Sequence, residues 1–233
     1  MNTYLQEIIT ILQKVDAEER GKMSVASEKI AEVIKNDGII YVFVCGHSHL
    51  PALDTFYRAG GLANVSPILD TDLMLHNGAS KSSRMEKMPN FAREILRSYT
   101  LTEKDVLVVI SASGKNAVPC EMVECAKVQG VYTMSISSSY YEEKGGKLLK
   151  IADIGIDNKV PYGDAVISVG QEKMGGMSTY SSMYILNNIL IGGAKLAQSQ
   201  GVEVPIYRSG NMDGGKEFNL ALEERYFSRV KHL

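Results

Sequence analysis

The chain has 233 residues, of which 45% are hydrophobic and 22% are charged, and its formal net charge is −2. This composition predicts one α/β domain with a large core, or one such domain with appendages. The scattered basic residues argue against a nucleic-acid surface, and no apolar run approaches the roughly 18 residues that a membrane span needs. Cys45, Cys120 and Cys125 lack CxxC spacing, which is typical of a reducing compartment, so we expect a cytoplasmic protein.

Two stretches with helical spacing of apolar residues open the chain, and a turn signal at Asn36-Asp37-Gly38 follows them. They predict a first helix over residues 5–15 and a second over 18–35. Short β-branched runs then alternate with helical patterns. The expected strands are 39–45, 65–69, 106–110, 131–137 and 151–156. The expected helices are 50–63, 91–98, 117–129, a short one ending at residue 149, and a long one from 178 to near residue 200.

This alternation of strands and helices predicts a parallel, three-layer α/β/α sandwich. Residues 159–176 are rich in glycine and charge, and we expect a loop there. A turn-rich segment begins at residue 201 and leads into a last short helix.

The most informative motif follows the expected strand at Val106–Ile110. Ser111 and Ser113 stand two residues apart, so both side chains point to one side of an extended strand end. Gly114 lets the backbone approach a ligand closely, and Asn116 can cap the helix that follows. Hydroxyls, loop amides and the positive end of a helix dipole together suit a phosphate group.

A similar turn follows the expected strand at 39–45, where Gly46 and Ser48 stand. Parallel strands end at one edge of a sheet, so the two serine-bearing turns predict a site for a phosphorylated small molecule. For an isolated Ser-x-Ser-Gly, an ordinary turn with an N-cap is the better interpretation, and it is the second turn that favours phosphate. Neither turn carries the glycine pattern of a dinucleotide loop or a Walker loop, so we expect neither a nicotinamide enzyme nor an NTPase.

The segments Cys45-Gly-His-Ser48 and Ile110-Ser-Ala-Ser-Gly-Lys-Asn116 resemble the two loops of the SIS (sugar isomerase) domain family, which binds phosphosugars. The second loop is most similar to that of N-acetylmuramic acid 6-phosphate etherases, and phosphoheptose isomerases are further away. The tail Ser209-Gly-Asn-Met-Asp-Gly-Gly215 resembles that of a bacterial SIS group. The resemblance covers residues 36–200, and it implies a flavodoxin-like, five-stranded sheet in dimers or tetramers with active sites between subunits.

By this resemblance, residues 1–35 are helices that pack on the core or on a partner subunit, and 201–233 are a C-terminal loop and helix. The resemblance also implies a set of residues around the phosphate: Ser48, Ser111, Ser113, Gly114 and Asn116. Further candidates are Ser137 and Ser138 after the fourth strand, which can equally be turn formers, and Lys173 and Ser178 near the last long helix.

Isomerisation of an aldose phosphate, or elimination beside a carbonyl, needs a base that removes a carbon-bound proton. Related etherases and heptose isomerases carry a glutamate ten residues beyond the serine of the first loop, and Arg58 stands there in this chain. Arg58 is no base at neutral pH, but it can pair with Asp54 or with an anionic ligand. Glu86 resembles the second etherase glutamate and is our acid/base candidate, with a solvated helical glutamate as the alternative.

His47 and His49 flank Ser48 and can polarise an oxygen or shuttle a proton. With Asp72 or His76 they would form a metal site only if folding brought them together, and no ligand spacing demands it. We therefore expect neither a metal nor an organic cofactor.

Together these residues predict a sugar-phosphate isomerase or an etherase-type lyase that takes a phosphorylated sugar or amino sugar. A non-catalytic phosphosugar sensor is the alternative, and Arg58 favours it. The long last helix carries more apolar positions than one sheet face needs, so we expect a homodimer or homotetramer.

Overall fold

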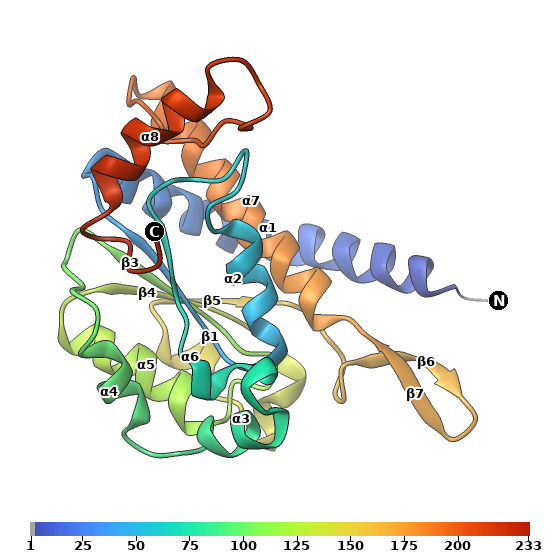
Figure 1. Cartoon of the computed structure of the whole chain (residues 1–233). Coiled ribbons are helices and arrows are strands. Elements are labelled where there is room, and N and C mark those ends of the chain that lie inside the picture. Colours follow the sequence, from blue (N-terminus) through green and yellow to red (C-terminus); the bar gives the residue numbers. More distant parts are fainter. Residues whose placement is uncertain (1–2) are drawn as a thin grey trace.

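The centre of the structure, a computed structural model that describes residues 3–233, is a parallel sheet with the strand order β2-β1-β3-β4-β5 (Figure 1). Its strands are β1 (Ile40–Val44), β2 (Val65–Ile68), β3 (Val106–Ile110), β4 (Tyr132–Ser137) and β5 (Ile154–Asp157). Every residue of β1 and β3 is buried, because helices cover both faces of the sheet. The predicted three-layer sandwich with five parallel strands is confirmed.

The helices form the two outer layers of the sandwich (Figure 1). One layer holds α1 (Tyr4–Lys35), α2 (His49–Thr55) and α7 (Ser178–Ser199), and the other holds α4 (Phe91–Leu96), α5 (Ala117–Val128) and α6 (Leu148–Ile151). The remaining helical elements are α3 (Ala79–Met85), α8 (Gly215–Tyr226) and the 3-10 turns Gly46–Ser48, Thr71–Leu73, Leu75–Asn77 and Ser139–Lys144. Over residues 3–233, no helix has both the length and the apolar character that a membrane crossing requires.

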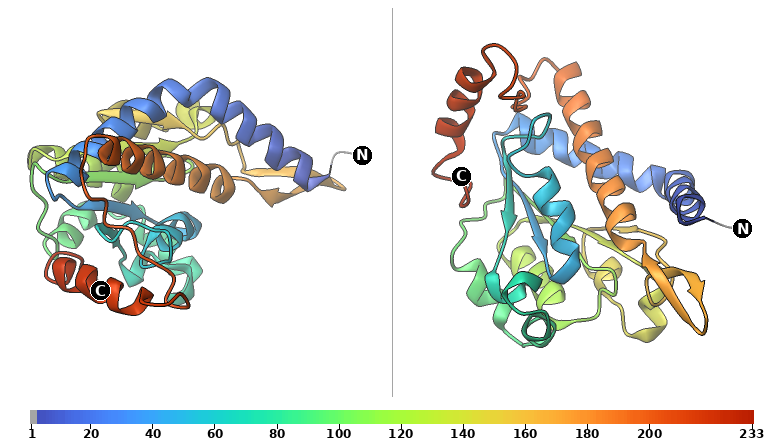
Figure 2. Two further views of the ribbon diagram at one scale, coloured as in Figure 1. Left: turned by 90° about the horizontal axis from the view of Figure 1, so that it is seen from above. Right: turned by 45° about the vertical axis from the view of Figure 1, so that its right-hand side comes forward.

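α1 is one continuous helix, so the prediction of two N-terminal helices was wrong. Neither proline nor glycine stands between residues 15 and 18, and Asp16 pairs with Arg20 across the expected break. Thr3 caps the start of the helix, where its side chain accepts a hydrogen bond from the amide of Gln6 at 3.3 Å. Figure 2 shows α1 lying along α7, with its N-terminal end extending beyond the sheet.

Residues 159–176 were expected to be a loop, but they contain an antiparallel hairpin of β6 (Ala165–Val169) and β7 (Glu172–Gly176). Gly170 opens its two-residue turn with a φ of +63°, a conformation that glycine adopts without strain. The hairpin projects from the body of the molecule near the start of α1 (Figure 1), and the Tyr4 hydroxyl donates a hydrogen bond to Gly176 O at 2.7 Å.

α2 ends at Thr55, whereas the sequence predicted a helix as far as residue 63. The C-terminal segment holds the chain that follows α2, because the amide of Gly60 donates to Tyr207 O at 2.8 Å and the amide of Ala63 donates to Pro205 O at 2.7 Å. These bonds join segments far apart in the sequence. No local pattern could therefore have predicted where α2 ends.

α8 is anchored to the turn before β1. The Asp37 carboxylate lies 2.7 Å from Arg225 Nη2 and 2.9 Å from Arg229 Nη2. Burial alone would raise the pKa of Asp37, but its hydrogen bonds and ion pairs with the two arginines hold that pKa below its usual value. Since Asp37 precedes β1, this anchor places α8 at the amino edge of the sheet.

A buried ionic cluster joins α1 to the chain after β5. Lys159 Nζ lies 2.8 Å from Glu19 Oε1 and 3.1 Å from Asp157 Oδ2, and the three side chains are 12%, 5% and 6% exposed, respectively. Burial alone would lower the pKa of Lys159, but its hydrogen bonds and the nearby carboxylates raise that pKa well above its usual value. Lys159 is thus the cation that balances two buried acids.

Replacement of Lys159 tests how strongly this cluster holds α1 on the sheet. In Lys159→Met, Asp157 loses its cation and Glu19 keeps only its pair with Lys22. We expect the free energy of unfolding, measured by urea denaturation, to fall by about 3 kcal/mol, because a buried charge is left unpaired.

The control is Lys150→Met, which breaks the pair of Lys150 with Glu142. The Lys150 side chain is 67% exposed, so we expect a loss of at most about 1 kcal/mol. Equal losses in the two variants would contradict a structural role for the cluster.

Candidate functional site

The two serine-bearing turns leave the sheet side by side. β1 and β3 are parallel neighbours with Val44 beside Ile110, so the residues that follow them emerge at the same level of the carboxyl edge. A cavity of about 340 Å³ lies there, and we call it the sheet-edge pocket. Six of the predicted site residues line it: His47, Ser48, Glu86, Ser111, Ser113 and Ser178.

The serine hydroxyls of the two turns are not equivalent. Ser48 and Ser113 line the pocket and make no side-chain hydrogen bond with any residue in the range 3–233, so both hydroxyls are free for a ligand. Ser111 is buried, and its oxygen accepts a hydrogen bond from the amide of Gly114 at 3.3 Å, which closes the turn. Ser137 lies beneath this turn and donates to Ala112 O at 3.4 Å.

Glu86 lies at the end of α3 and is tied to the second turn. Its main-chain oxygen accepts a hydrogen bond from the amide of Val118 at 3.1 Å, and its carboxylate accepts one from the side-chain amide of Asn116. Asn116 was expected to cap α5. It occupies the N-cap position, but its side chain caps no amide and holds Glu86 instead. The Glu86 carboxylate is therefore positioned at the pocket by the chain at the start of α5.

The pocket carries more negative than positive side chains. Glu86 and Asp164 line it, and no Lys or Arg of the described chain does, so His47 is the one lining side chain there that can become a cation. Burial raises the pKa of the Cys45 thiol well above its usual value, and the carboxylates of Glu86 and Asp70 raise it further. An anion bound here must rely on hydroxyls, loop amides and the N-terminus of α5.

Asp164 also lines the pocket and was not predicted from the sequence. Asp164 Oδ1 accepts hydrogen bonds from the amides of Met177 at 2.8 Å and Ser178 at 2.7 Å, and the Ser178 hydroxyl donates to Oδ2 at 2.9 Å. Asp164 thereby caps α7 from across the hairpin. Because Asp164 and Ser178 lie far apart in the sequence, no local pattern predicts that they pair. Three further lining residues that carry hydroxyl groups were also not predicted: Ser82, Ser83 and Tyr141.

Several predicted residues lie away from the pocket lining. Ser138 is buried and donates a hydrogen bond to Val160 O at 2.6 Å, which fits its alternative interpretation as a turn former. His49 contacts Gly46 O through Nδ1, and its ring centre is 6.2 Å from that of His76. Within residues 3–233, no three His, Cys, Asp or Glu side chains come together as a metal site. Lys173 is exposed on β7.

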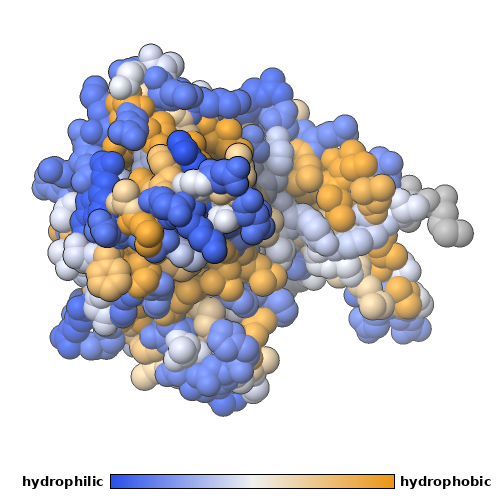
Figure 3. All heavy atoms as spheres, turned by 45° about the horizontal axis from the view of Figure 1, so that its top comes forward, coloured by the Kyte–Doolittle hydropathy of each residue, from blue (hydrophilic) through white to orange (hydrophobic). Residues whose placement is uncertain are grey.

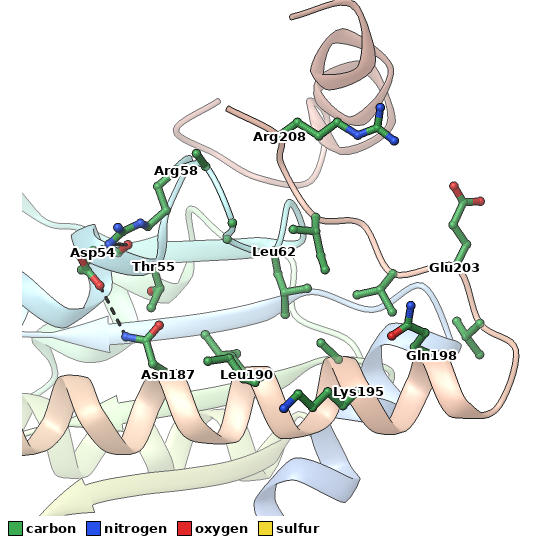
Figure 4. Close-up of a pocket in the computed structure, with 18 of the residues that line it drawn as sticks. Asp54, Thr55, Arg58, Leu62, Asn187, Leu190, Lys195, Gln198, Glu203 and Arg208 are labelled. Atoms are coloured by element: carbon green, nitrogen blue, oxygen red, sulfur yellow. Dashed lines mark hydrogen bonds and ion pairs between the residues drawn. The ribbon is translucent and has the colours of Figure 1, made fainter. Parts of the chain in front are cut away.

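Arg58 lies outside the sheet-edge pocket and beside two other cavities. The larger of these has a volume of about 820 Å³ and lies between α2, α7 and the C-terminal segment (Figure 4). Arg58 pairs with Asp54, as the sequence suggested, although α2 has ended before it. Asn187 of α7 also points toward Asp54 from across this cavity (Figure 4).

Comparison with known proteins identifies the family. The model of the SIS domain matches residues 3–138. This chain is a SIS-domain protein. Over its whole length it is 37% identical to UPF0309 protein TTE0306 of Caldanaerobacter subterraneus subsp. tengcongensis, with both chains covered completely. It is 39% identical to UPF0309 protein BH0227 of Halalkalibacterium halodurans, with 100% of this chain and 97% of that protein covered.

Solved structures share the fold of this SIS domain. Phosphoheptose isomerase GmhA from Neisseria gonorrhoeae matches with a TM-score of 0.52 and 19% identity, over 84% of this chain and 95% of that one. The sugar isomerase domain of an RpiR transcription factor from Sphaerobacter thermophilus matches with a TM-score of 0.54 and 13% identity, over 96% of each chain. The family resemblance drawn from the two loops is confirmed.

Replacement of Gly114 tests how closely the second SIS loop is packed. Its φ is +57°, and a Cβ there would lie 2.5 Å from Ser137 Oγ and 2.8 Å from Leu148 Cβ. In Gly114→Ala we expect about 1–2 kcal/mol of backbone strain, together with about 1–3 kcal/mol from the steric clash. Urea denaturation measures their sum as a loss in the free energy of unfolding.

Gly46 provides a matched control, because its φ is +54° and nothing lies within 4 Å of an added Cβ. Gly46→Ala should therefore show the backbone strain alone. If both variants lose the same stability, the close packing of Gly114 against Ser137 and Leu148 does not constrain the loop.

Proposed function

We propose that the sheet-edge pocket binds a phosphorylated sugar or amino sugar and that Glu86 removes a proton next to its carbonyl group. One observation carries this proposal. The free hydroxyls of Ser48 and Ser113 line the same cavity as the Glu86 carboxylate. An anion-binding end and a fixed carboxylate in one small pocket suit a substrate held at its phosphate and processed at its far end.

Serine hydroxyls and loop amides would hold the phosphate. Ser48, Ser111 and Ser113 come from two turns at the same sheet edge, and α5 begins just beyond the second turn. The amino end of a helix is a favourable place for a phosphate group. The fold shared with phosphoheptose isomerase GmhA also supports a phosphosugar as the ligand.

The chemistry would be general acid/base catalysis. Glu86 takes the proton from the carbon beside the carbonyl, and the electron pair of that bond forms an enediolate or enolate. His47 donates a hydrogen bond to the oxygen that gains negative charge. In an isomerisation, Glu86 then returns the proton to the neighbouring carbon, and His47 carries a proton from one enediolate oxygen to the other. In an elimination, the ether oxygen leaves with the proton that Glu86 holds, and the electrons of the enolate form the new carbon–carbon double bond. Asn116 acts as a positioning residue that orients the Glu86 carboxylate.

A non-catalytic phosphosugar sensor is the second candidate function. Arg58 favours it, because the etherase-like glutamate is replaced by a residue that pairs with Asp54 and does not line the pocket. Such a protein would need the phosphate-binding turns and would not need Glu86 as a base. Binding and turnover therefore separate the two functions.

We also propose that the protein forms a homo-oligomer through the face of α7 that points away from the sheet. Residues 178–194 contain no charged side chain, yet Tyr180 and Ile191 are 46% and 53% exposed. Leu5 of α1 and Met174 of the hairpin are also exposed. Figure 3 shows apolar surface, in orange, toward the N-terminal end of the chain. Uncharged, exposed helix faces of this kind are typical of subunit interfaces.

A cytoplasmic location is part of the same proposal. Cys45 and Cys120 are buried thiols, Cys125 is half-buried, and all three are unpaired in the described chain. Free thiols of this kind persist in a reducing compartment. Sugar phosphates are also charged metabolites that cells keep inside the membrane.

Removal of the turn hydroxyls tests phosphate binding. In Ser111→Ala/Ser113→Ala we expect the affinity for hexose, heptose or amino-sugar phosphates to fall about ten- to hundredfold, because hydrogen bonds to a charged group are lost. Isothermal titration calorimetry against a panel of these ligands measures the change. Ser24→Ala/Ser98→Ala, which removes two exposed hydroxyls outside the pocket lining, should bind like the parent.

Glu86→Gln tests catalysis. Gln keeps the size of the side chain and loses its basicity, so we expect turnover of the cognate phosphosugar, followed by mass spectrometry, to fall about 10²- to 10⁴-fold while binding persists. Turnover that survives in this variant would eliminate Glu86 as the base. If the parent protein binds the phosphosugars but converts none of them, the sensor function is the correct one.

A further inference from the structure

A second polar cavity lies at the amino edge of the sheet, where the C-terminal segment meets the chain that follows α2. The backbone fixes this meeting point: the amide of Gly60 donates to Tyr207 O at 2.8 Å, and the amide of Tyr207 donates to Gly61 O at 2.9 Å. The cavity has a volume of about 520 Å³. It adjoins the 820 Å³ cavity of Figure 4, since Arg58 and Arg208 line both.

Tyr207 lines this cavity, and its buried hydroxyl has no partner within the described residues. Its side chain is only 4% exposed, and the hydroxyl makes no hydrogen bond with any residue in the range 3–233. Glu223, the acid nearest at hand, instead accepts a hydrogen bond from Tyr57 at 2.9 Å. Burial, and after it the Glu223 carboxylate, raise the pKa of Tyr207 to about 12, so the hydroxyl remains a donor. A ligand oxygen that enters from the cavity would supply the acceptor that this buried donor lacks.

The charged groups around this cavity are mostly cations. Arg58, Arg208 and Lys216 line it, against one acid, Glu223. The guanidinium carbon of Arg208 lies over the Phe218 ring, 3.6 Å from its centre, and the guanidinium has no ion pair within residues 3–233. A planar guanidinium without an ion pair can make two parallel hydrogen bonds to a carboxylate or phosphate.

The tail motif Ser209–Gly215 contributes to the lining of this cavity. Gly210 lines the cavity, and Lys216 lies one residue after the motif ends at Gly215. The segment is held in place by Asn219, whose side chain accepts from the amide of Arg208 and donates to its carbonyl oxygen, each at 2.9 Å. The cations and the unpaired hydroxyl are thus presented by one ordered segment.

We propose that this cavity is a second ligand site, which binds a small organic oxyanion, either a phosphate ester or a carboxylate, through Tyr207, Arg208 and Lys216. The site lies at the sheet edge opposite the pocket assigned above and does not depend on the function proposed for that pocket. A ligand there would join the C-terminal segment to the loop after α2, since Arg58 faces it from that loop.

Tyr207→Phe should affect the stability of the ligand-free protein and its affinity for a ligand in opposite ways. The hydroxyl has no protein partner, so its removal should leave the midpoint of thermal unfolding of the ligand-free protein unchanged or raised. The same change should weaken ligand binding about tenfold or more, because a hydrogen bond to an anion is lost. A fall in stability without ligand, or unchanged binding, would overturn the proposal.

Binding is measured by isothermal titration calorimetry on the full chain carrying Ser111→Ala/Ser113→Ala, with glucose 6-phosphate and citrate as probes. We expect at least one probe to bind, and the probe that binds identifies the oxyanion as a phosphate ester or a carboxylate. Arg208→Gln should weaken this binding about tenfold or more, whereas Arg97→Gln, an equal change of charge on the far layer, should leave it unchanged. Binding of neither probe, or equal affinities in the two arginine variants, would refute the site.

The two proposals fail in different ways. If the sheet-edge pocket binds no phosphate, the parent and the Ser111→Ala/Ser113→Ala variant will have equal affinity for phosphosugars. That result leaves the comparison of Arg208→Gln with Arg97→Gln intact. Should the double serine variant not fold, the parent protein supplies the same test, since Arg208→Gln should weaken one of its binding events about tenfold or more and Arg97→Gln should weaken none.

Discussion

The pairing of β1 with β3 is the constraint on which the sheet-edge pocket depends. With Val44 beside Ile110, both chains leave the sheet at one level, and their turns face a single cavity. Both strands are buried on both faces, so a shift in register would misplace every apolar side chain along them. Glu86 joins this arrangement through Val118 and Asn116, which follow the second turn. The candidate site therefore takes its geometry from the buried centre of the sheet.

Features fixed by neighbouring residues could be predicted from the sequence, and features fixed by distant contacts could not. β-Branched runs located the five strands, and the turns after two of them located Ser48 and Ser111. The early end of α2 escaped prediction because the C-terminal segment holds the following chain. Asp164 escaped because it caps α7 from before the hairpin. The unbroken α1 escaped for another reason, since two apolar stretches were predicted as separate helices although nothing between them interrupts a helix.

The two edges of the sheet differ in their electrostatics. The carboxyl edge gathers hydroxyls and carboxylates without a lysine or arginine in the described pocket lining, so an anion there would be held by hydrogen bonds. The amino edge gathers cations on the C-terminal segment, whose attachment depends on Asp37 and its two arginines. An anion there would be held mainly by charge. Its binding would weaken more with added salt, because salt screens exposed charges and has less effect on neutral hydroxyls.

The hairpin has a consequence for how the carboxyl edge can respond to its surroundings. Asp164 stands directly before β6 and Ser178 two residues after β7, and these two residues are bonded to each other at the pocket wall. The base of the hairpin therefore forms part of the pocket wall. A partner molecule that displaced the hairpin would move Asp164 and Ser178 with it, and so would change the shape of the pocket while the sheet stayed in place.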